Sequence, residues 1–268
     1  MRAAGRVYRR LLVAGFRRQS TYRLAALGGL VANTTFGFLK VAILFAAVRA
    51  AGGELQGYDL GAVAAYVWIS QGMLGSVNLN GRSDLADRIK DGDVAVDLMR
   101  PVDVQGAFVA TEVGRSLFAF LPRGLPTFTI GAVVVGVPLP DDPLVYPLGV
   151  LSILLAVTVS ATTVYLLATT GFWLVETRGL QLLYMIVSGF LAGLYLPIWF
   201  FPDWLVVVAS ATPFPAMLMY PTDVLSGRVD LAGGVVHVLV QLAWLAATVA
   251  AGQGLTRAGR RRLEVQGG

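Results

Sequence analysis

Long apolar segments separated by short charged ones dominate the pattern of this chain. Six segments are long and apolar enough to be predicted as membrane-crossing helices, since about 20 residues are needed to cross a hydrocarbon core of about 30 Å. They are residues 24–48, 60–79, 109–137, 146–174, 180–200 and 235–252. The third is irregular in sequence, and the longer ones must tilt, kink or project beyond the bilayer.

The composition agrees with this pattern. Charged residues make up 14% of the chain and hydrophobic residues 56%, whereas soluble domains carry about 25% charged residues. We therefore predict an all-α membrane protein with six transmembrane helices in a single domain over residues 1–268. Residues 1–23 are cytoplasmic, residues 24–252 hold the spans, and residues 253–268 form a basic cytoplasmic tail. No internal repeat is visible, so a transporter built from inverted halves has little support.

The distribution of Lys and Arg predicts the orientation. Segments between alternate spans, together with both ends, carry 16 of the 21 basic residues, and the opposite segments carry only Arg49 and Arg228. Cytoplasmic segments of membrane proteins are enriched in Lys and Arg. Both termini are therefore predicted to be cytoplasmic.

Other functional classes lack the residues they need. The chain has no cysteine and a single histidine, His237, so a metal site is not expected. The net charge of +5 is concentrated in basic ends without stacking aromatics, which favours contact with anionic lipid over nucleic acid. No catalytic constellation of side chains and no G-x-x-x-x-G-K-[ST] phosphate loop occurs in the sequence.

The loop over residues 81–103 is the most informative cytoplasmic segment. Ser83 is predicted to cap a short helix, in which Leu85 and Ile89 share one face because they are four residues apart. Such a helix is either a docking element for a partner protein or part of an ordinary solvated loop. The residues assigned to docking are Asp84, Leu85, Asp87, Arg88, Ile89, Lys90 and Asp91.

A second unusual segment follows the fifth span. Residues 205–220 are apolar but short and interrupted by proline, which favours a re-entrant or interfacial pair of helices on the outer side. The alternative, a seventh span, would place the basic C-terminus outside. The residues assigned to this outer re-entrant segment are Pro197, Pro202, Trp204, Pro213, Phe214 and Pro215.

Polar residues within spans require partners, a wet cavity or an interface. Asn33, Lys40 and His237 are candidates for lining a pathway, although Lys40 can instead extend to the interface and His237 can be a packing residue. Glu112 and Arg115 are three residues apart and can form an ion pair. We expect these two residues in an interfacial stretch, with Arg123 extending toward water.

Three stretches carry a resemblance to a known family. Residues 88–93 (RIKDGD) with 97–101 (DLMRP) are similar to an "I-x-x-G … L-x-R-P" loop, although Met99 stands where leucine is commoner. Residues 193–197 (GLYLP) with 201–205 (FPDWL) resemble "G-x-x-x-P … F-P-x-W". Residues 212–215 (TPFP), Pro221 and residues 225–227 (LSG) resemble "P-F … P … L-x-G". This order of motifs resembles the permease subunits of type-2 ABC exporters, in a bacterial branch of about this length.

The resemblance implies a multi-pass protein of the bacterial cytoplasmic membrane. It adds an N-terminal interfacial helix, for which the amphipathic residues 4–20 are suitable, a cytoplasmic coupling helix in the first loop and short outer helices between spans five and six. It implies two ABC ATPase subunits and a second permease, related or identical, as partners. The chain itself would bind no cofactor and would not be an enzyme, with ATP and Mg held by the partner ATPase. The alternatives are a secondary transporter or channel not driven by ATP, and a membrane enzyme acting on lipid.

The charge distribution generates a test of topology. A cysteine introduced as Asp142→Cys should react with a membrane-impermeant maleimide added outside, because residue 142 lies in a predicted outer loop. The matched variant Asp91→Cys should react only after the membrane is opened. Labelling of residue 142 from the cytoplasmic side alone would contradict the predicted orientation.

Overall fold

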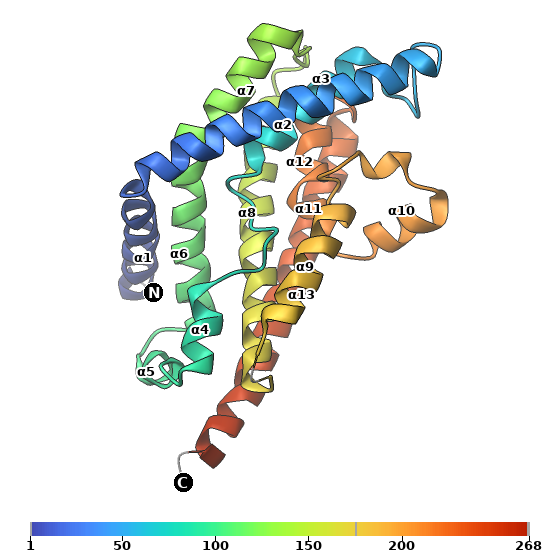
Figure 1. Cartoon of the computed structure of the whole chain (residues 1–268). Helices are drawn as coiled ribbons and strands as arrows, with labels where there is room; N and C mark the ends of the chain where they lie inside the picture. The colour runs from blue at the N-terminus through green and yellow to red at the C-terminus, as the bar shows by residue number, and fades with distance from the viewer. Residues whose placement is uncertain (1, 175, 267–268) are drawn as a thin grey trace.

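The computed structural model of the chain describes residues 2–174 and 176–266, and within these ranges it is built from helices without strands (Figure 1). The π-helical turn Phe120–Gly124 follows α6, and a second one, Ala132–Gly136, follows α7. The two α-helices and the two π-helical turns form one long bent helix. The α-helices are α1 Arg2–Ser20, α2 Arg23–Ala50, α3 Leu60–Met73, α4 Asp84–Lys90, α5 Val94–Met99, α6 Val104–Ala119, α7 Leu125–Gly131, α8 Val145–Thr169, α9 Arg178–Leu191, α10 Asp203–Ser210, α11 Phe214–Met217, α12 Met219–Leu225 and α13 Leu231–Gln266.

Four helices are long and apolar enough to cross a membrane: Leu24–Ala50, Val104–Gly136, Val145–Phe172 and Leu231–Arg262. They correspond to four of the six predicted spans. The most apolar window of α8 is 67% buried inside the chain, against 28% for α2. Figure 1 shows α6, α8 and α13 running in similar directions, while α2 crosses over one end of them. The helix α8 is therefore the centre of the packing.

The other two predicted spans contain shorter helices than expected. Both α3 and α9 have 14 residues, which corresponds to a length of about 21 Å at 1.5 Å per residue. The segment after α3 bends because Asn78 and Asn80 follow it, and α9 ends shortly before Gly193, whose φ of 77° belongs to the left-handed region. Each of these two predicted spans therefore consists of a short helix followed by irregular backbone.

The third predicted span is irregular, as expected. A proline has no N–H to donate within a helix, and its ring displaces the carbonyl four residues earlier. Pro122 lies inside the π-helical turn Phe120–Gly124, and Pro126 follows at the start of α7. The bent helix extends over Val104–Gly136 and includes Glu112 and Arg115. These two residues therefore belong to the same continuous helix as Arg123.

Polar side chains join α8 to α13 along their shared face. Each pair is buried, so each hydroxyl or amide requires a partner inside the protein. The hydrogen-bonded pairs are Ser152 with Gln241 (2.8 Å), Thr162 with Thr248 (2.8 Å) and Tyr165 with Thr256 (2.6 Å). Gln241 also donates to the Ala216 carbonyl at 2.8 Å. These contacts fix the relative position of the two helices and attach α11 to them.

The predicted break after the fifth span is present. Residues 203–225 form three short helices, α10, α11 and α12, instead of one continuous crossing helix. Pro213 and Pro215 lie at the turn between α10 and α11, while Trp204 on α10 is exposed. In Figure 1, α10 projects to one side, whereas α11 and α12 lie beside α8 and α13. The segment therefore leaves the body of the protein and returns to it.

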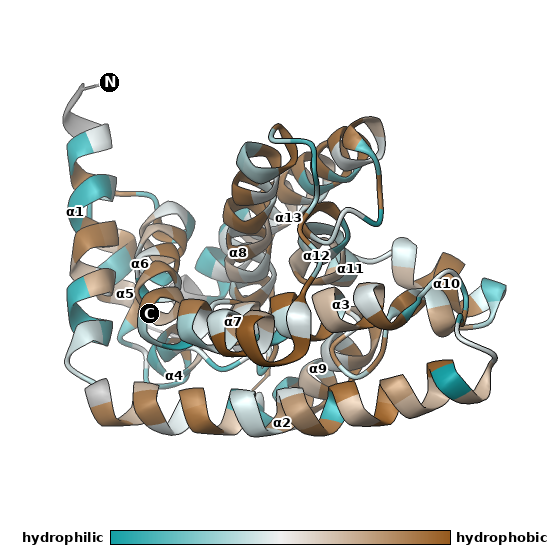
Figure 2. Cartoon of the chain, turned by 90° about the horizontal axis from the view of Figure 1, so that it is seen from above, coloured by the Kyte–Doolittle hydropathy of each residue, from teal (hydrophilic) through white to brown (hydrophobic). Residues whose placement is uncertain are grey.

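The N-terminal helix packs along α6 through two glycines. A Cβ atom on Gly15 would lie 2.1 Å from the Thr111 carbonyl oxygen, and one on Gly114 would lie 1.9 Å from the Leu12 carbonyl oxygen. Only hydrogen atoms allow such an approach of two backbones. Figure 2 shows α1 leaving one end of α2, beside α6. The apolar face predicted for residues 4–20 thus covers another helix of the same chain.

This packing predicts that Gly114→Ala separates α1 from α6, because overpacking of a tight contact costs about 1–3 kcal/mol. Phe16 and Phe118 lie across this contact with ring centroids 5.1 Å apart. In the cysteine-free chain, Phe16→Cys with Phe118→Cys should form a crosslink that Gly114→Ala reduces severalfold. Gly28→Ala is the matched control, since a Cβ atom there meets nothing within 4 Å. Equal crosslinking in both backgrounds would contradict the packing.

Candidate functional site

The helix α4 packs against the end of α8 and not outward. Leu85 and Ile89 are only 5% and 6% exposed, and they join a buried cluster with Tyr165 and Ala168 of α8. Both residues were assigned to docking, but their side chains pack inside this chain, and the assignment of the other residues of α4 to docking stays a prediction. The four-residue spacing correctly indicated one buried face, but the surface that buries it belongs to this chain.

The predicted cap of α4 is also different. Ser83 occupies the N-cap position, but its side chain makes no capping hydrogen bond. Its buried hydroxyl has no hydrogen-bond partner among the described residues. Packing against α8, and not a side-chain cap, therefore holds the first turn of α4.

Ion pairs attach α4 to three other parts of the chain. Arg18 of α1 lies 2.7 Å from the Asp84 carboxylate, Arg88 lies 2.7 Å from Asp97 of α5, and Lys90 lies 3.0 Å from Glu176. The hydrogen bond from Lys90 lowers the pKa of the Glu176 carboxyl, as does a further one from the Arg178 backbone N–H. Exposed pairs of this kind contribute little to stability, but they set the position of α4 relative to α1 and α9.

The outward surface of this loop lies on α4 and α5. Asp87 and Asp91 are exposed on α4 and at its end. On α5, the apolar side chains of Val96 and Met99 are 47% and 78% exposed. Large apolar groups exposed on a short polar loop are typical of interaction surfaces. We call Asp87, Asp91, Val96 and Met99 the loop surface.

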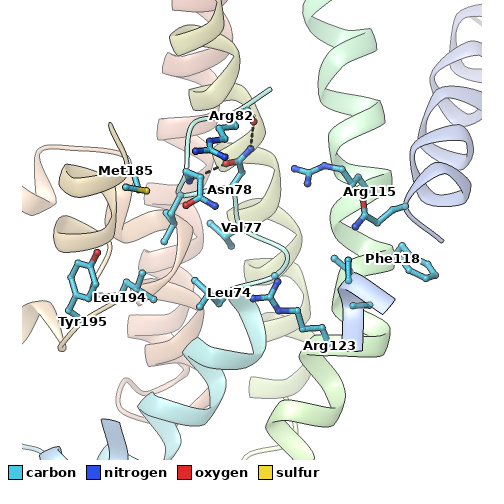
Figure 3. Close-up of a pocket in the computed structure, with 17 residues that line it drawn as sticks. Leu74, Val77, Asn78, Arg82, Arg115, Phe118, Arg123, Met185, Leu194 and Tyr195 are labelled. Atoms are coloured by element: carbon cyan, nitrogen blue, oxygen red, sulfur yellow. Dashed lines mark hydrogen bonds between the residues drawn. The ribbon is translucent and has the colours of Figure 1, made fainter. Parts of the chain in front are cut away.

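A cavity of about 520 Å³ lies between α2, α6 and the segments that follow α3 and α9. We call it the inner cavity, and Figure 3 shows the side chains around it. The lining includes Leu74, Asn78, Arg82, Arg115, Arg123 and Leu194. Three arginines and no carboxylate line it among the described residues. Apolar side chains of Leu74 and Leu194 form part of the opposite wall.

Asn78 positions Arg82 at the mouth of the inner cavity. The Asn78 Oδ1 accepts hydrogen bonds from the backbone N–H groups of Asn80 and Gly81, at 3.2 and 3.1 Å, and its Nδ2 donates to the Arg82 carbonyl at 2.9 Å. A side chain that binds its own following backbone in this way fixes a turn. The Asn78 backbone N–H is itself bound by Ser160 of α8 at 2.9 Å.

Arg123 enters the inner cavity through a slot between two glycines. A Cβ atom on Gly29 would lie 2.8 Å from Arg123 Nε, and one on Gly75 would lie 2.9 Å from its Cδ. The guanidinium donates to Asn33 Oδ1 at 2.6 Å, and Asn33 in turn donates to the Gln71 carbonyl at 3.0 Å. Arg123 was predicted to extend toward water, whereas the two glycines and Asn33 hold its half-buried side chain at the wall of the inner cavity.

A second cavity of about 430 Å³, the vestibule, shares Gln19, Arg82 and Arg115 with the inner cavity. Asp84, Lys90 and Glu176 also line it, so it lies next to α4. The predicted pair between Glu112 and Arg115 is confirmed, with Arg115 Nε donating to Glu112 Oε2 at 3.0 Å. The vestibule therefore contains charges of both signs.

Lys40 forms a separate buried contact. Its ammonium donates to Tyr66 Oη at 2.8 Å and to the Leu194 carbonyl at 2.6 Å, while Tyr66 donates to the Gly193 carbonyl at 2.6 Å. These two carbonyls lie just after α9, in backbone that has no regular helical partners. Lys40 thus binds the backbone after this helix, and its assignment to a pathway stays a prediction, as does that of Asn33.

His237 lies in a buried cluster with Asp223 of α12. Its Nε2 is 4.0 Å from an Asp223 carboxylate oxygen, and neither ring nitrogen has a hydrogen-bond partner among the described residues. The other Asp223 neighbours are Trp199 Nε1 at 2.9 Å and Arg228 Nε at 3.9 Å. These contacts attach the outer helices to the start of α13.

Sequence reasoning missed Asn78, Arg82 and Tyr195 as lining residues of the inner cavity. One signal was available: two asparagines and an arginine interrupt the apolar pattern at the end of the second predicted span. The position of Leu194 and Tyr195 on the other wall follows only from the long-range packing of α9.

A family model described as "ABC-2 family transporter protein" matches residues 31–267 of the chain. The match begins within α2 and includes the loop surface, the outer helices and the lining of the inner cavity except Gln19, Ala25 and Ala26. Neither the curated proteins nor the solved structures contain a match to this chain.

The packing of α4 predicts that Leu85→Ala with Ile89→Ala destabilises the chain on its own. Removing buried aliphatic side chains costs about 2 kcal/mol or more each. The purified chain should therefore have a lower midpoint of thermal unfolding, and residues 81–103 should be cut faster by protease. Val96→Ala with Met99→Ala is the control, because both side chains are exposed. Equal midpoints for the two double variants would refute the packing of α4 on α8.

Proposed function

Because this chain belongs to the ABC-2 family of transporter proteins, we propose that it is the permease of an ATP-driven exporter, working with a second permease and two separate ATPase subunits. Membership of the family makes it a multi-pass membrane component of an ABC transporter. The observation that carries the finer proposal is the loop over residues 81–103, which is anchored to α8 on one face and presents the loop surface on the other.

Energy must reach the chain through a protein contact. The sequence contains no phosphate-binding loop of the G-x-x-x-x-G-K-[ST] type, and this type of loop is what binds the β- and γ-phosphates in P-loop ATPases. In the proposal, ATP and Mg bind the partner, and the permease performs no catalysis itself.

The contacts of α4 support a route for the movement. The helix packs against α8 through Leu85 and Ile89, and ion pairs connect it to α1 and to the segment before α9. Closely packed protein interiors have low compressibility, so a displacement of one helix is transmitted to the helix that it contacts. A displacement of α4 by the ATPase would therefore reach α8, and through the hydrogen-bonded pairs it would reach α13.

Exposed apolar faces support the pairing with a second permease and with lipid. On α2, Leu24, Val31 and Ile43 are at least 66% exposed. On α9, Leu183 and Ile186 are both 56% exposed. Apolar surface of this extent in a chain of this family is suited to lipid or to another permease. The two helices also flank the inner cavity, so a second permease on this side would enclose it.

The distribution of charge supports the placement in a bacterial cytoplasmic membrane with α4 and α5 on the cytoplasmic side. The basic N-terminal and C-terminal segments lie on that side under the positive-inside rule. Figure 1 shows α4, α5 and the end of α13 near the same end of the molecule. An ATPase docked on the loop surface would then be in the compartment that contains ATP.

The proposal predicts that Val96→Ala with Met99→Ala weakens binding of the ATPase. Apolar anchors at the centre of an interface commonly cost about 2 kcal/mol when truncated, which is roughly thirtyfold in affinity. The measurement is capture of the ATPase encoded beside this chain by the permease in detergent, followed by its ATP hydrolysis. The double variant should have an unchanged unfolding midpoint.

Leu139→Ala is the matched control, since Leu139 is 61% exposed in the loop before α8 and lies outside residues 81–103. Its capture of the ATPase should equal that of the unmodified chain. The docking surface is wrong if the double variant captures the ATPase and couples hydrolysis to transport as well as the control does.

A further inference from the structure

We propose that the inner cavity binds an amphiphilic anion, a molecule with a phosphate or carboxylate head and an apolar tail. The inference rests on the proposed function, because it assigns a substrate class to the cavity that lies between the exposed faces of α2 and α9. It depends on three observations: unneutralised arginines, a preformed position for one of them, and an apolar wall opposite.

Most basic residues of the vestibule lie close to carboxylates, whereas two of the three arginines of the inner cavity do not. In the vestibule, Arg18, Lys90 and Arg178 each lie within 3.7 Å of a carboxylate oxygen. Arg115 is paired with Glu112. Arg82 and Arg123 have no carboxylate within ion-pairing distance among the described residues.

Two cations without a counter-charge attract an anion, and they repel a cation. The attraction increases with depth, because a half-buried site is screened less by salt than the surface is. An anion that passes the mixed charges of the vestibule would therefore stop where Arg82 and Arg123 face the inner cavity (Figure 3).

Arg123 is held in place before any ligand arrives. Gly29 and Gly75 leave space for its side chain, and Asn33 accepts only one of its donors. A guanidinium presents several donors in a planar fork that matches phosphate and carboxylate oxygens. The free donors of a prepositioned arginine are suited to such a head group.

The opposite wall is suited to a tail. Leu74, Met185 and Leu194 line the inner cavity from α9 and from the segments after α3 and α9, with Phe118 on the α6 side. Each methylene buried on apolar surface increases affinity about fourfold. Inorganic phosphate would gain only the head contacts, and a neutral alcohol of the same length would gain only the tail contacts. An amphiphilic anion gains both.

The test uses the full chain in nanodiscs of zwitterionic lipid, with a fluorescent dodecyl phosphate as the probe. Competitors are unlabelled dodecyl phosphate, dodecanoate, dodecanol, dodecyltrimethylammonium and inorganic phosphate. The two anionic amphiphiles should displace the probe at concentrations at least tenfold lower than the neutral, cationic and tail-free competitors. A parallel set of nanodiscs containing phosphatidylglycerol separates the sources: displacement there assigns the site to bilayer lipid, and retention assigns it to a smaller amphiphile.

The variants are Arg123→Gln and Arg82→Gln. Hydrogen bonds to charged groups are worth enough that each should weaken probe binding about tenfold or more. Arg123→Lys keeps the charge but loses the fork, so it should bind with intermediate affinity. Arg178→Gln is the matched control, because Arg178 is already paired with Glu176 and does not line the inner cavity. It should bind the probe within twofold of the unmodified chain.

Equal displacement by dodecyltrimethylammonium, or probe binding unaffected by both glutamine variants, would overturn the proposal. So would equal displacement by inorganic phosphate, because the tail would then contribute nothing. Capture of the ATPase is measured on the same preparations. Failed capture with intact probe binding would refute the proposed function alone, whereas intact capture with unselective binding would refute the anion site alone.

Discussion

Polar groups in an apolar helical protein must find their partners inside the chain, and this constraint explains most of the architecture. A buried amide or hydroxyl without a partner costs about 1–3 kcal/mol. The hydrogen bonds between α8 and α13 satisfy it along the most buried of the four long apolar helices. Lys40 satisfies it just after α9, since its ammonium binds the backbone carbonyl of Leu194. The irregular backbone after α3 and α9 is tolerated because side chains from other helices bind it.

Contacts within the chain also make the loop over residues 81–103 stiff. A loop held only by solvent would absorb a push from a partner, whereas α4 is buried on one face against α8. The ion pairs around it connect α4 to α1, α5 and the start of α9, although each pair is weak by itself. Apolar packing therefore supplies the stiffness, and the charges set the orientation. A partner that contacts α5 would act on an element already joined to the centre of the fold.

The sequence predicted the positions of the helices more successfully than the surfaces against which the helices pack. Periodicity identified the short helix at Asp84–Lys90, the long helices α8 and α13, and the proline break before α12. It also indicated that Leu85 and Ile89 share a buried face, but an amphipathic pattern does not say which surface covers that face. The lengths of α3 and α9 were overestimated because hydropathy does not distinguish a helix from apolar irregular backbone. Arg123 was placed wrongly because its slot depends on Gly29 and Gly75, from two other elements.

The number of arginines predicts the orientation of the chain, whereas the surroundings of each arginine decide whether it can bind an anion. The positive-inside rule counts Arg18, Arg82 and Arg178 equally, since each lies on the predicted cytoplasmic side. The fold separates them, because Arg18 and Arg178 are close to carboxylates whereas Arg82, which lines both cavities, has no carboxylate within ion-pairing distance among the described residues. An arginine whose only role is to orient the chain in the membrane would be stable at the lipid surface. Two arginines without carboxylates line the inner cavity, the exposed Arg82 at its mouth and the half-buried Arg123. Their mutual repulsion raises the electrostatic free energy of the empty protein, and a bound anion would lower it.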